Sequence, residues 1–134
     1  MIDPKELRIG NYIKEWGDGI GRVLAIHGDG DVVCSCNNLA LPAANFWAIP
    51  LIPDVLLKCG FKWSGESHLE TGVEGDKNLA FLCKDGLIEK MLFYLDDDHD
   101  DGSFSIVEFK PPKFLHQLQN LYFALTGKEL DITL

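Results

Sequence analysis

Residues 113–130 read KFLHQLQNLYFALTGKEL, and this stretch decides the fold class. Its apolar residues recur three or four positions apart, which is the spacing of one face of an α-helix. They are Phe114, Leu115, Leu118, Leu121, Tyr122 and Leu125. Pro111-Pro112 precede the stretch and Gly127 lies near its end, so the pattern predicts a terminal helix over 113–126. A helix with one apolar face must pack on something, and the preceding residues read as short strands.

Residues 1–50 predict a barrel-like antiparallel meander. Apolar and β-branched segments flank Gly28-Asp29-Gly30-Asp31, a sequence typical of a tight reversal. An apolar strand with an internal glycine, followed by a Gly-rich loop and another strand, resembles the start of small SH3-like barrels. Residues 39–50 contain Pro42 and Pro50, so we expect an irregular or edge segment there.

The second half predicts one short helix and a second meander. Pro53 suits a first helical position and Gly60 suits a stop, which indicates a helix over 53–59. Residues 61–109 then predict an antiparallel meander, in which Asp85-Gly86 signals a two-residue hairpin turn. Strands are expected at Lys62-Trp63, 79–83, 88–95 and 103–109, and the polar stretch with Glu66, Glu70, Glu74 and Asp76 reads as loop.

These elements predict one α+β domain over 1–134. We expect an antiparallel, bent sheet or a partly open SH3-like barrel, packed by the C-terminal helix, with one short helix besides. A chain of 134 residues fits one domain, and it buries enough surface to form a stable core without disulfides or a structural metal.

Composition narrows the class of protein. The chain is 46% hydrophobic and 25% charged, as in ordinary folded domains, and it has no apolar run of the roughly 20 residues that a membrane span needs. Its first residues lack a signal-peptide pattern, so we expect a cytoplasmic protein without membrane contact. Accordingly, the four cysteines, Cys34, Cys36, Cys59 and Cys83, are expected to be reduced thiols. The net charge of −9 disfavours a general nucleic-acid binder.

The acidic loop 96–101 is the strongest candidate for metal chemistry. Counted from Asp97, Asp101, Gly102 and Glu108 take the fifth, sixth and twelfth places of a helix-loop-helix calcium site. His99 stands at the third place, where an Asp or Asn is expected, and strands flank the loop. A solvated hairpin loop is therefore favoured over a cation site.

Other reactive constellations are incomplete. Cys34 and Cys36, with His27 across the same hairpin, give three soft zinc ligands without an identifiable fourth, so buried thiols are favoured. The four histidines are scattered, and no nucleophile elbow, phosphate-binding loop or dinucleotide motif occurs in the sequence. No catalytic, cofactor-binding or metal-ligating residue is assigned, and no cofactor is expected.

Exposed aromatic residues are the candidate binding anchors. Trp16, Trp47, Trp63 and Phe46 are of the residue types that dominate interface energetics when exposed, although core packing is expected to use at least two of them. On the terminal helix, His116, Gln117, Gln119 and Asn120 form a polar, uncharged side. This side either faces water or hydrogen-bonds a partner.

Three blocks carry a family resemblance. They are Leu7-Arg8-Ile9-Gly10-Asn11, then Ile49-Pro50-Leu51 with Leu56-Leu57-Lys58-Cys59-Gly60-Phe61, and His116 through Gly127. Together they resemble a group of small uncharacterised proteins of Bacteroidetes and of their prophages and mobile elements. Ile52-Pro53-Asp54 departs from the group, which tends to place a helix-capping Thr there. The resemblance implies a bacterial or phage cytoplasmic protein and transfers no catalytic residue.

The expected function is therefore a non-enzymatic accessory or protein-interaction module of a phage or mobile element, with another protein as its partner. One alternative is a small metal-assisted enzyme that uses the acidic loop 96–101 with a histidine. The other alternative is a nucleic-acid-binding barrel, which requires Lys14, Arg22 and Trp16 on one exposed face.

Overall fold

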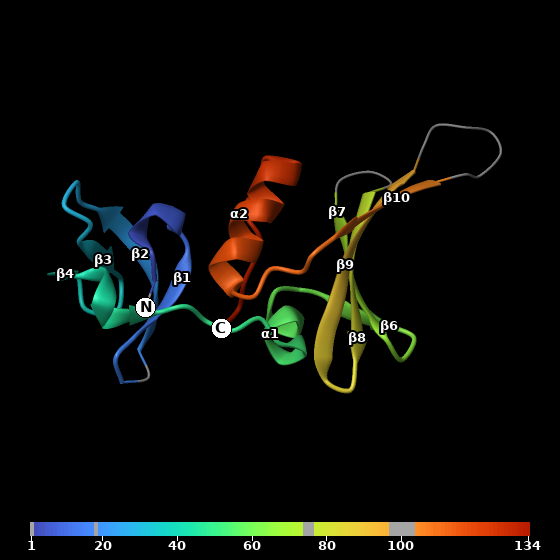
Figure 1. Ribbon diagram of the computed structural model, residues 1–134, viewed down its shortest axis with the longest axis horizontal. Coiled ribbons are helices and arrows are strands. Elements are labelled where there is room, and N and C mark those ends of the chain that lie inside the picture. Colours follow the sequence, from blue (N-terminus) through green and yellow to red (C-terminus); the bar gives the residue numbers. More distant parts are fainter. Residues whose placement is uncertain (1, 18, 74–76, 97–103) are drawn as a thin grey trace. The chain divides into compact units, whose positions relative to one another are not determined.

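The computed structural model describes residues 2–17, 19–73, 77–96 and 104–134. The chain forms two compact units: unit 1 comprises Met1–Pro50 with Pro112–Glu129, and unit 2 comprises Leu51–Pro111 with Leu130–Leu134. Each unit contains a five-stranded antiparallel sheet (Figure 1), so the fold class is α+β, as predicted. Among the described residues, neither sheet closes into a barrel, and each has one edge strand on either side.

The sheet of unit 1 has the strand order β4-β3-β2-β1-β5. Its elements are η1 (Pro4–Glu6), β1 (Tyr12–Glu15), β2 (Ile20–Ile26), β3 (Val32–Cys34), β4 (Ala40–Leu41), η2 (Ala43–Asn45) and β5 (Phe46–Trp47). Strand alternation turns Ile13, Val23 and Phe46 to one face, where they are buried. Together with Ile2, Leu7, Val32 and Cys34 they form a hydrophobic cluster. The short strands β4 and β5 occupy the two edges, which confirms the edge character predicted for residues 39–50.

Helix α2 (Leu115–Thr126) belongs to unit 1, where it contacts β1. The terminal helix is confirmed, but it begins two residues later than predicted. Phe114 has an extended backbone and forms a β-bridge with Pro50. The Leu115 N–H donates to the Ile49 carbonyl at 2.8 Å. The residues before Leu115 therefore pair with the 49–50 segment in place of a further helical turn. The helix ends at Gly127, whose φ of 73° is the left-handed conformation of a helix stop.

The sheet of unit 2 is a meander with the order β10-β9-β8-β7-β6. Its elements are α1 (Pro53–Lys58), β6 (Lys62–Ser64), β7 (His68–Val73), β8 (Lys77–Lys84), β9 (Leu87–Asp96) and β10 (Phe104–Phe109). Helix α1 contacts β7, and the Phe61 and Phe81 rings meet edge-to-face at 5.4 Å in the core. The predicted helix over 53–59 is confirmed, and Ile52 gives it no side-chain cap.

The hairpin turn between β8 and β9 is the one predicted. Asp85 and Gly86 have φ values of 54° and 76°, and Lys84 pairs with Leu87 around them. The reading of the polar stretch as loop fails for Glu70, because residues 68–73 form β7; Glu66 lies in the turn before that strand, and Glu74 and Asp76 lie outside the described residues. Leu69 on this strand is fully buried between β6 and β8, while Glu70 is only partly covered. Period-two alternation with few apolar residues is a weak sequence signal.

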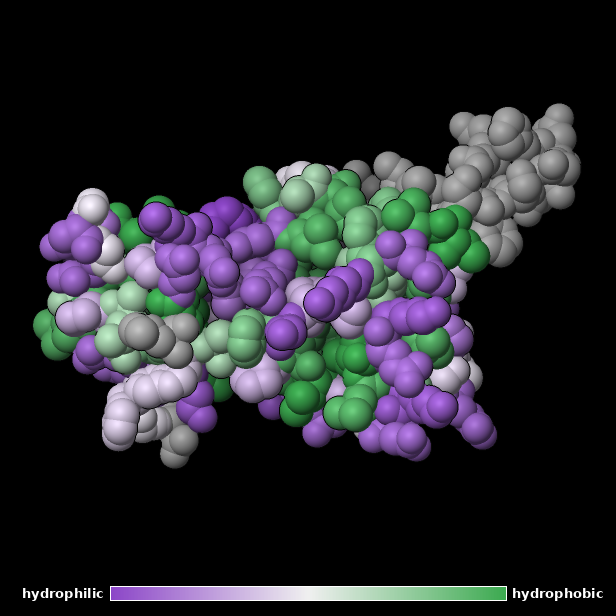
Figure 2. All heavy atoms as spheres, in the orientation of Figure 1, coloured by the Kyte–Doolittle hydropathy of each residue, from purple (hydrophilic) through white to green (hydrophobic). Residues whose placement is uncertain are grey.

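Some of the exposed hydrophobic surface of unit 2 lies on its edge strand β10. Ile106 and Val107 of this strand are exposed side chains, and Figure 2 shows hydrophobic residues at the surface among hydrophilic ones. Within the described ranges, no helix combines the length and the apolar character needed to cross a membrane.

Candidate functional site

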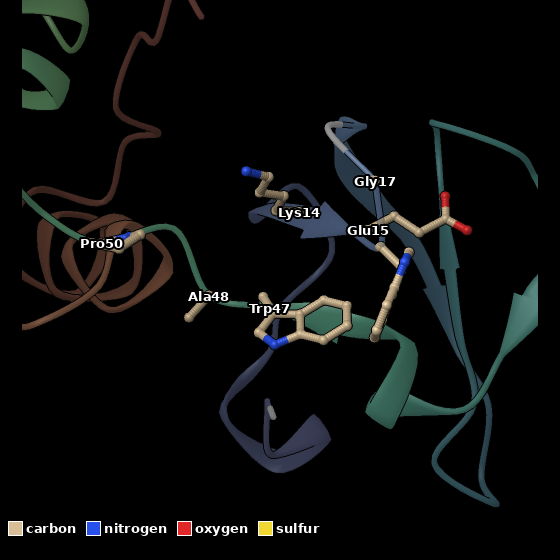
Figure 3. Close-up of a pocket in the computed structure, with 7 residues that line it drawn as sticks. Lys14, Glu15, Gly17, Trp47, Ala48 and Pro50 are labelled. Atoms are coloured by element: carbon tan, nitrogen blue, oxygen red, sulfur yellow. The ribbon is translucent and has the colours of Figure 1, made fainter.

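An open groove in unit 1, lined by two tryptophans, is a candidate binding site (Figure 3). It has a volume of about 430 Å³, and we call it the aromatic groove. Its lining comes from the end of β1 and from the segment that begins with β5: Lys14, Glu15, Trp16, Gly17, Trp47, Ala48 and Pro50. The volume lies in the range of ordinary ligand sites.

Register explains why the two tryptophans reach this groove. In the β1–β5 pair, Glu15 lies opposite Phe46 and Lys14 opposite Trp47. Phe46 therefore enters the core, while Trp47, one residue later, faces outward with 36% of its surface exposed. Trp16 follows β1 directly and is 79% exposed. The two indole rings meet edge-to-face with centroids 5.2 Å apart.

Charge at the groove is carried by Lys14. The Glu15 carboxylate points away from Trp47 in Figure 3 and accepts a hydrogen bond from Asn37 Nδ2 at 2.6 Å. It also accepts one from the Cys36 thiol at 3.2 Å. The Glu15 carboxylate is thus hydrogen-bonded on the side away from Trp47, and Lys14 is the basic residue of the lining.

The outer face of the sheet continues this pattern. Tyr12 lies two residues before Lys14, and Arg22 pairs with Tyr12 across β1–β2, so alternation puts these side chains on one face. The Arg22 guanidinium lies 5.9 Å from the centre of the Tyr12 ring. With Trp16, this gives the arrangement that the nucleic-acid alternative requires. Tyr12 was not among the predicted anchors, although Tyr12, Lys14 and Trp16 are spaced with a period of two.

A smaller pocket adjoins the aromatic groove. It has a volume of about 150 Å³ and is lined by Ile2, Glu6, Trp47, Ala48, Phe114 and His116. Trp47 and Ala48 line both hollows, so the two are neighbours along this segment. We call it the His116 pocket.

His116 is almost fully buried, with 1% of its surface exposed. Its Nε2 lies 3.4 Å from Glu6 Oε2, and its ring stacks on Phe114 with centroids 6.0 Å apart. Burial lowers the pKa of His116, and the neighbouring Glu6 carboxylate acts in the opposite direction. Among the described residues, Nδ1 has no hydrogen-bond partner.

The polar side of α2 is used within the chain. Gln119 is buried; its Oε1 accepts from the Tyr12 N–H at 2.8 Å, and its Nε2 donates to the Gly10 carbonyl at 3.2 Å. Asn120 Oδ1 accepts from Arg8 Nε and from Asn11 Nδ2. Arg8 also pairs with Glu129 and lies over the Phe123 ring. We call Arg8, Asn11, Gln119 and Asn120 the polar latch, and its bonds hold the helix rather than a partner.

Two thiols meet beside the sheet. Cys34 and Cys36 Sγ lie 2.7 Å apart, so the structure brings this predicted pair together. Burial, together with hydrogen bonds to Cys34 and Glu15, raises the pKa of Cys36 to about 12. The proposed third ligand, His27, is exposed on the β2–β3 turn. In the part of the chain that the structure describes, no group of three or more His, Cys, Asp or Glu side chains is placed to hold a metal ion.

The other sequence candidates divide between the two units. The acidic loop 96–101 lies outside the described residues beyond Asp96, so the calcium and metal-assisted alternatives stay predictions. Trp63 on β6 of unit 2 is 47% exposed. Of the four aromatic candidates, Phe46 alone is buried, so the expectation that the core uses at least two of them was wrong; the register of β5 explains this for Trp47.

Comparisons of this chain with protein-family models, with curated proteins and with solved structures find no match.

Proposed function

We propose that the protein is a non-enzymatic interaction module whose unit 1 binds a segment of a partner protein in the aromatic groove. The observation that carries the proposal is the Trp16–Trp47 pair, in which a 79% exposed indole stands against a second exposed indole over a groove of about 430 Å³. Large exposed aromatic residues of this kind are the usual anchors of protein interfaces.

The position of the groove favours an extended segment as its occupant. Strand β5, which carries Trp47, is an edge strand of the sheet. A partner chain in extended conformation lies naturally along such an edge and places alternate side chains into adjoining hollows. The aromatic groove and the His116 pocket provide two such hollows, joined through Trp47.

The biological setting of the proposal comes from the three-block resemblance. We place the protein as a cytoplasmic accessory protein of a phage or mobile element in Bacteroidetes. Such a protein recognises a partner and catalyses no reaction. This agrees with a groove lined by two indole rings, one lysine and the aliphatic residues Ala48 and Pro50.

The test is a pull-down from a Bacteroidetes lysate with three forms of the full chain: wild type, Trp16→Ala and Trp63→Ala. Trp63 is the matched control because it is an exposed tryptophan of unit 2. We expect the same identified protein with the wild type and Trp63→Ala, and about tenfold or greater depletion with Trp16→Ala, as for an interface hot spot. Equal recovery by all three forms would contradict the proposal.

Single-stranded nucleic acid is the second candidate occupant, favoured by one observation. Lys14, Arg22 and Trp16 share one face of unit 1. Unit 1 has seven acidic and six basic residues, whereas unit 2 has fourteen and six, so the negative charge of the chain is concentrated in unit 2. Lys14 and Arg22 alone give weak phosphate binding, because affinity grows with the number of basic side chains that contact phosphates. Arg22 also lies near the Tyr12 ring. Under the protein-binding proposal, gel shifts with single-stranded DNA and RNA at low salt show no complex.

A further inference from the structure

Cys34 and Cys36 hold their sulfurs next to each other at the end of β3. Cys34 is the last residue of this strand, and its carbonyl accepts from the Asn38 N–H at 2.9 Å, which closes the turn that contains Cys36. The turn brings the two Sγ atoms to 2.7 Å from each other. An S–S bond is about 2.05 Å long, so a side-chain movement of about 0.7 Å joins the two sulfurs.

The neighbouring strand leaves room for this pair. A Cβ built on Gly21 of β2 would lie 2.6 Å from Cys34 Sγ and 2.9 Å from the backbone nitrogen of Cys36. The absence of a side chain at Gly21 therefore allows the turn and its thiols to pack against β2. Cys34 is buried and Cys36 is partly exposed, so Cys36 carries the sulfur that a reagent in solution reaches first.

The surroundings of Cys36 do not stabilise a thiolate. Its thiol donates to Glu15 Oε2 at 3.2 Å, and a carboxylate at this distance disfavours negative charge on the sulfur. Burial, together with the hydrogen bonds to Cys34 and Glu15, raises the pKa of Cys36 to about 12. Because a stabilised thiolate favours the reduced form of a cysteine pair, its absence favours the disulfide at equilibrium, although it slows the exchange reaction.

We infer that Cys34 and Cys36 are a dithiol–disulfide pair that a low-molecular-weight disulfide of the glutathione class oxidises. The Cys36 thiolate attacks one sulfur of the reagent and releases a first thiol. Cys34 Sγ, on losing its proton, then attacks Cys36 Sγ in the mixed disulfide and releases a second thiol. Two electrons pass from the two cysteines to the reagent, and the two protons end on the released thiols. The product lacks the S–H donor, so Glu15 loses its hydrogen bond from Cys36 and keeps that from Asn37.

The sequence isolates this pair for the test. No Lys or Arg occurs between Arg22 and Lys58, so trypsin releases residues 23–58 as one peptide whose only cysteines are Cys34 and Cys36. Cys59 and Cys83 fall on other peptides and serve as internal controls. The folded full chain is equilibrated at pH 8 with glutathione mixtures of graded oxidised-to-reduced ratio, starting from both the reduced and the oxidised protein. Samples are quenched with acid, denatured, alkylated, digested and weighed by mass spectrometry.

Oxidation is expected on the 23–58 peptide alone. This peptide should lose two hydrogens and take up no alkyl group, while the peptides with Cys59 and Cys83 are alkylated. A parallel series in urea measures the contribution of the fold. Since the folded chain holds the two sulfurs together, its equilibrium constant for oxidation by glutathione should be at least about tenfold larger than in urea.

Three results would overturn the inference, whatever occupies the aromatic groove. The 23–58 peptide could take up two alkyl groups at every glutathione ratio, or its oxidation could stop at a glutathione adduct. Equal equilibrium constants in the folded chain and in urea would show that the turn does not hold the two sulfurs for bond formation.

Discussion

Asn11 and Asn120 are joined side chain to side chain: Asn11 Nδ2 donates to Asn120 Oδ1 at 2.9 Å. The two residues stand 109 positions apart, one in the Leu7–Asn11 block and one in the block from His116 to Gly127. Two sequence segments that lie far apart along the chain therefore meet in unit 1, at the polar latch. These residues attach α2 to unit 1, while the aromatic groove is lined by other residues.

Removal of the latch is expected to destabilise unit 1. Asn11 is fully buried, and its Oδ1 accepts from the Arg8 N–H at 2.7 Å. Asn11→Ala removes the acceptor of the Arg8 N–H and a donor to Asn120 Oδ1. We expect this loss to lower the free energy of unfolding by about 1–3 kcal/mol. Urea denaturation measures this. Asn78→Ala, at an exposed position of β8, is the control, with an expected change within about 0.5 kcal/mol; equal effects of the two variants would argue against the latch.

A methyl group at Gly21 is expected to disturb the packing under β2. A Cβ built there lies 2.6 Å from Cys34 Sγ and 2.9 Å from the backbone nitrogen of Cys36, closer than real contacts allow. Gly21→Ala should lower the thermal midpoint, with a loss of about 1–3 kcal/mol as for an overpacked core. Gly28→Ala, whose Cβ has open space, is the matched control. An unchanged midpoint in Gly21→Ala would show that this strand can shift.

Stability is expected to fall on acidification through His116. Its pKa in the folded protein lies below the ordinary value of 6.5, so the unfolded chain binds the proton more tightly. The free energy of unfolding is therefore unaffected by this residue well above pH 6.5. It decreases below that pH until the folded pKa is reached, with a slope of at most about 1.4 kcal/mol per pH unit. Glu6, which contacts the ring, opposes the shift.

Denaturation of His116→Asn between pH 5 and 8 checks this dependence. The variant should lack the part of the acid-side slope that His116 contributes, whatever its absolute stability. His27→Asn, at an exposed histidine, is the matched control. Parallel curves for wild type and His116→Asn would refute the assignment.

Cys59, which is buried, and Cys36, which is partly buried, should resist alkylation in the folded state. Burial raises the pKa of Cys59 to about 11, and burial with hydrogen bonding raises that of Cys36 to about 12, so both are protonated at pH 8. Iodoacetamide labelling followed by mass spectrometry should be at least about tenfold slower in native protein than in urea, since only the thiolate reacts. Rapid native labelling of Cys36 would contradict the environment described here.

The main elements were predictable because their signals are local. Helix α2 follows from apolar spacing between Pro112 and Gly127, and the β8–β9 hairpin follows from Asp85-Gly86, where both residues take positive φ. Strand β7 was missed because Leu69 is its main core residue while its neighbours are polar. Its burial comes from pairing on both sides, which a single segment does not reveal.

The site was only partly predictable. The tryptophans were recognised as anchors, but their exposure depends on the register of β1 with β5, a contact between segments 30 residues or more apart. Likewise, Gln119 and Asn120 were read as facing water or a partner, whereas they bond the backbone of Gly10 and Tyr12 and the side chains of Arg8 and Asn11. Long-range hydrogen bonds of this kind leave no periodic trace in sequence.

The most direct measurement of the central claim is the response of the three indole N–H resonances to the bound partner segment in NMR. The protein has three tryptophans, so each signal reports one site. We predict that the Trp16 and Trp47 signals shift while the Trp63 signal stays in place. A shift of Trp63 with Trp16 and Trp47 unmoved would contradict binding at the aromatic groove.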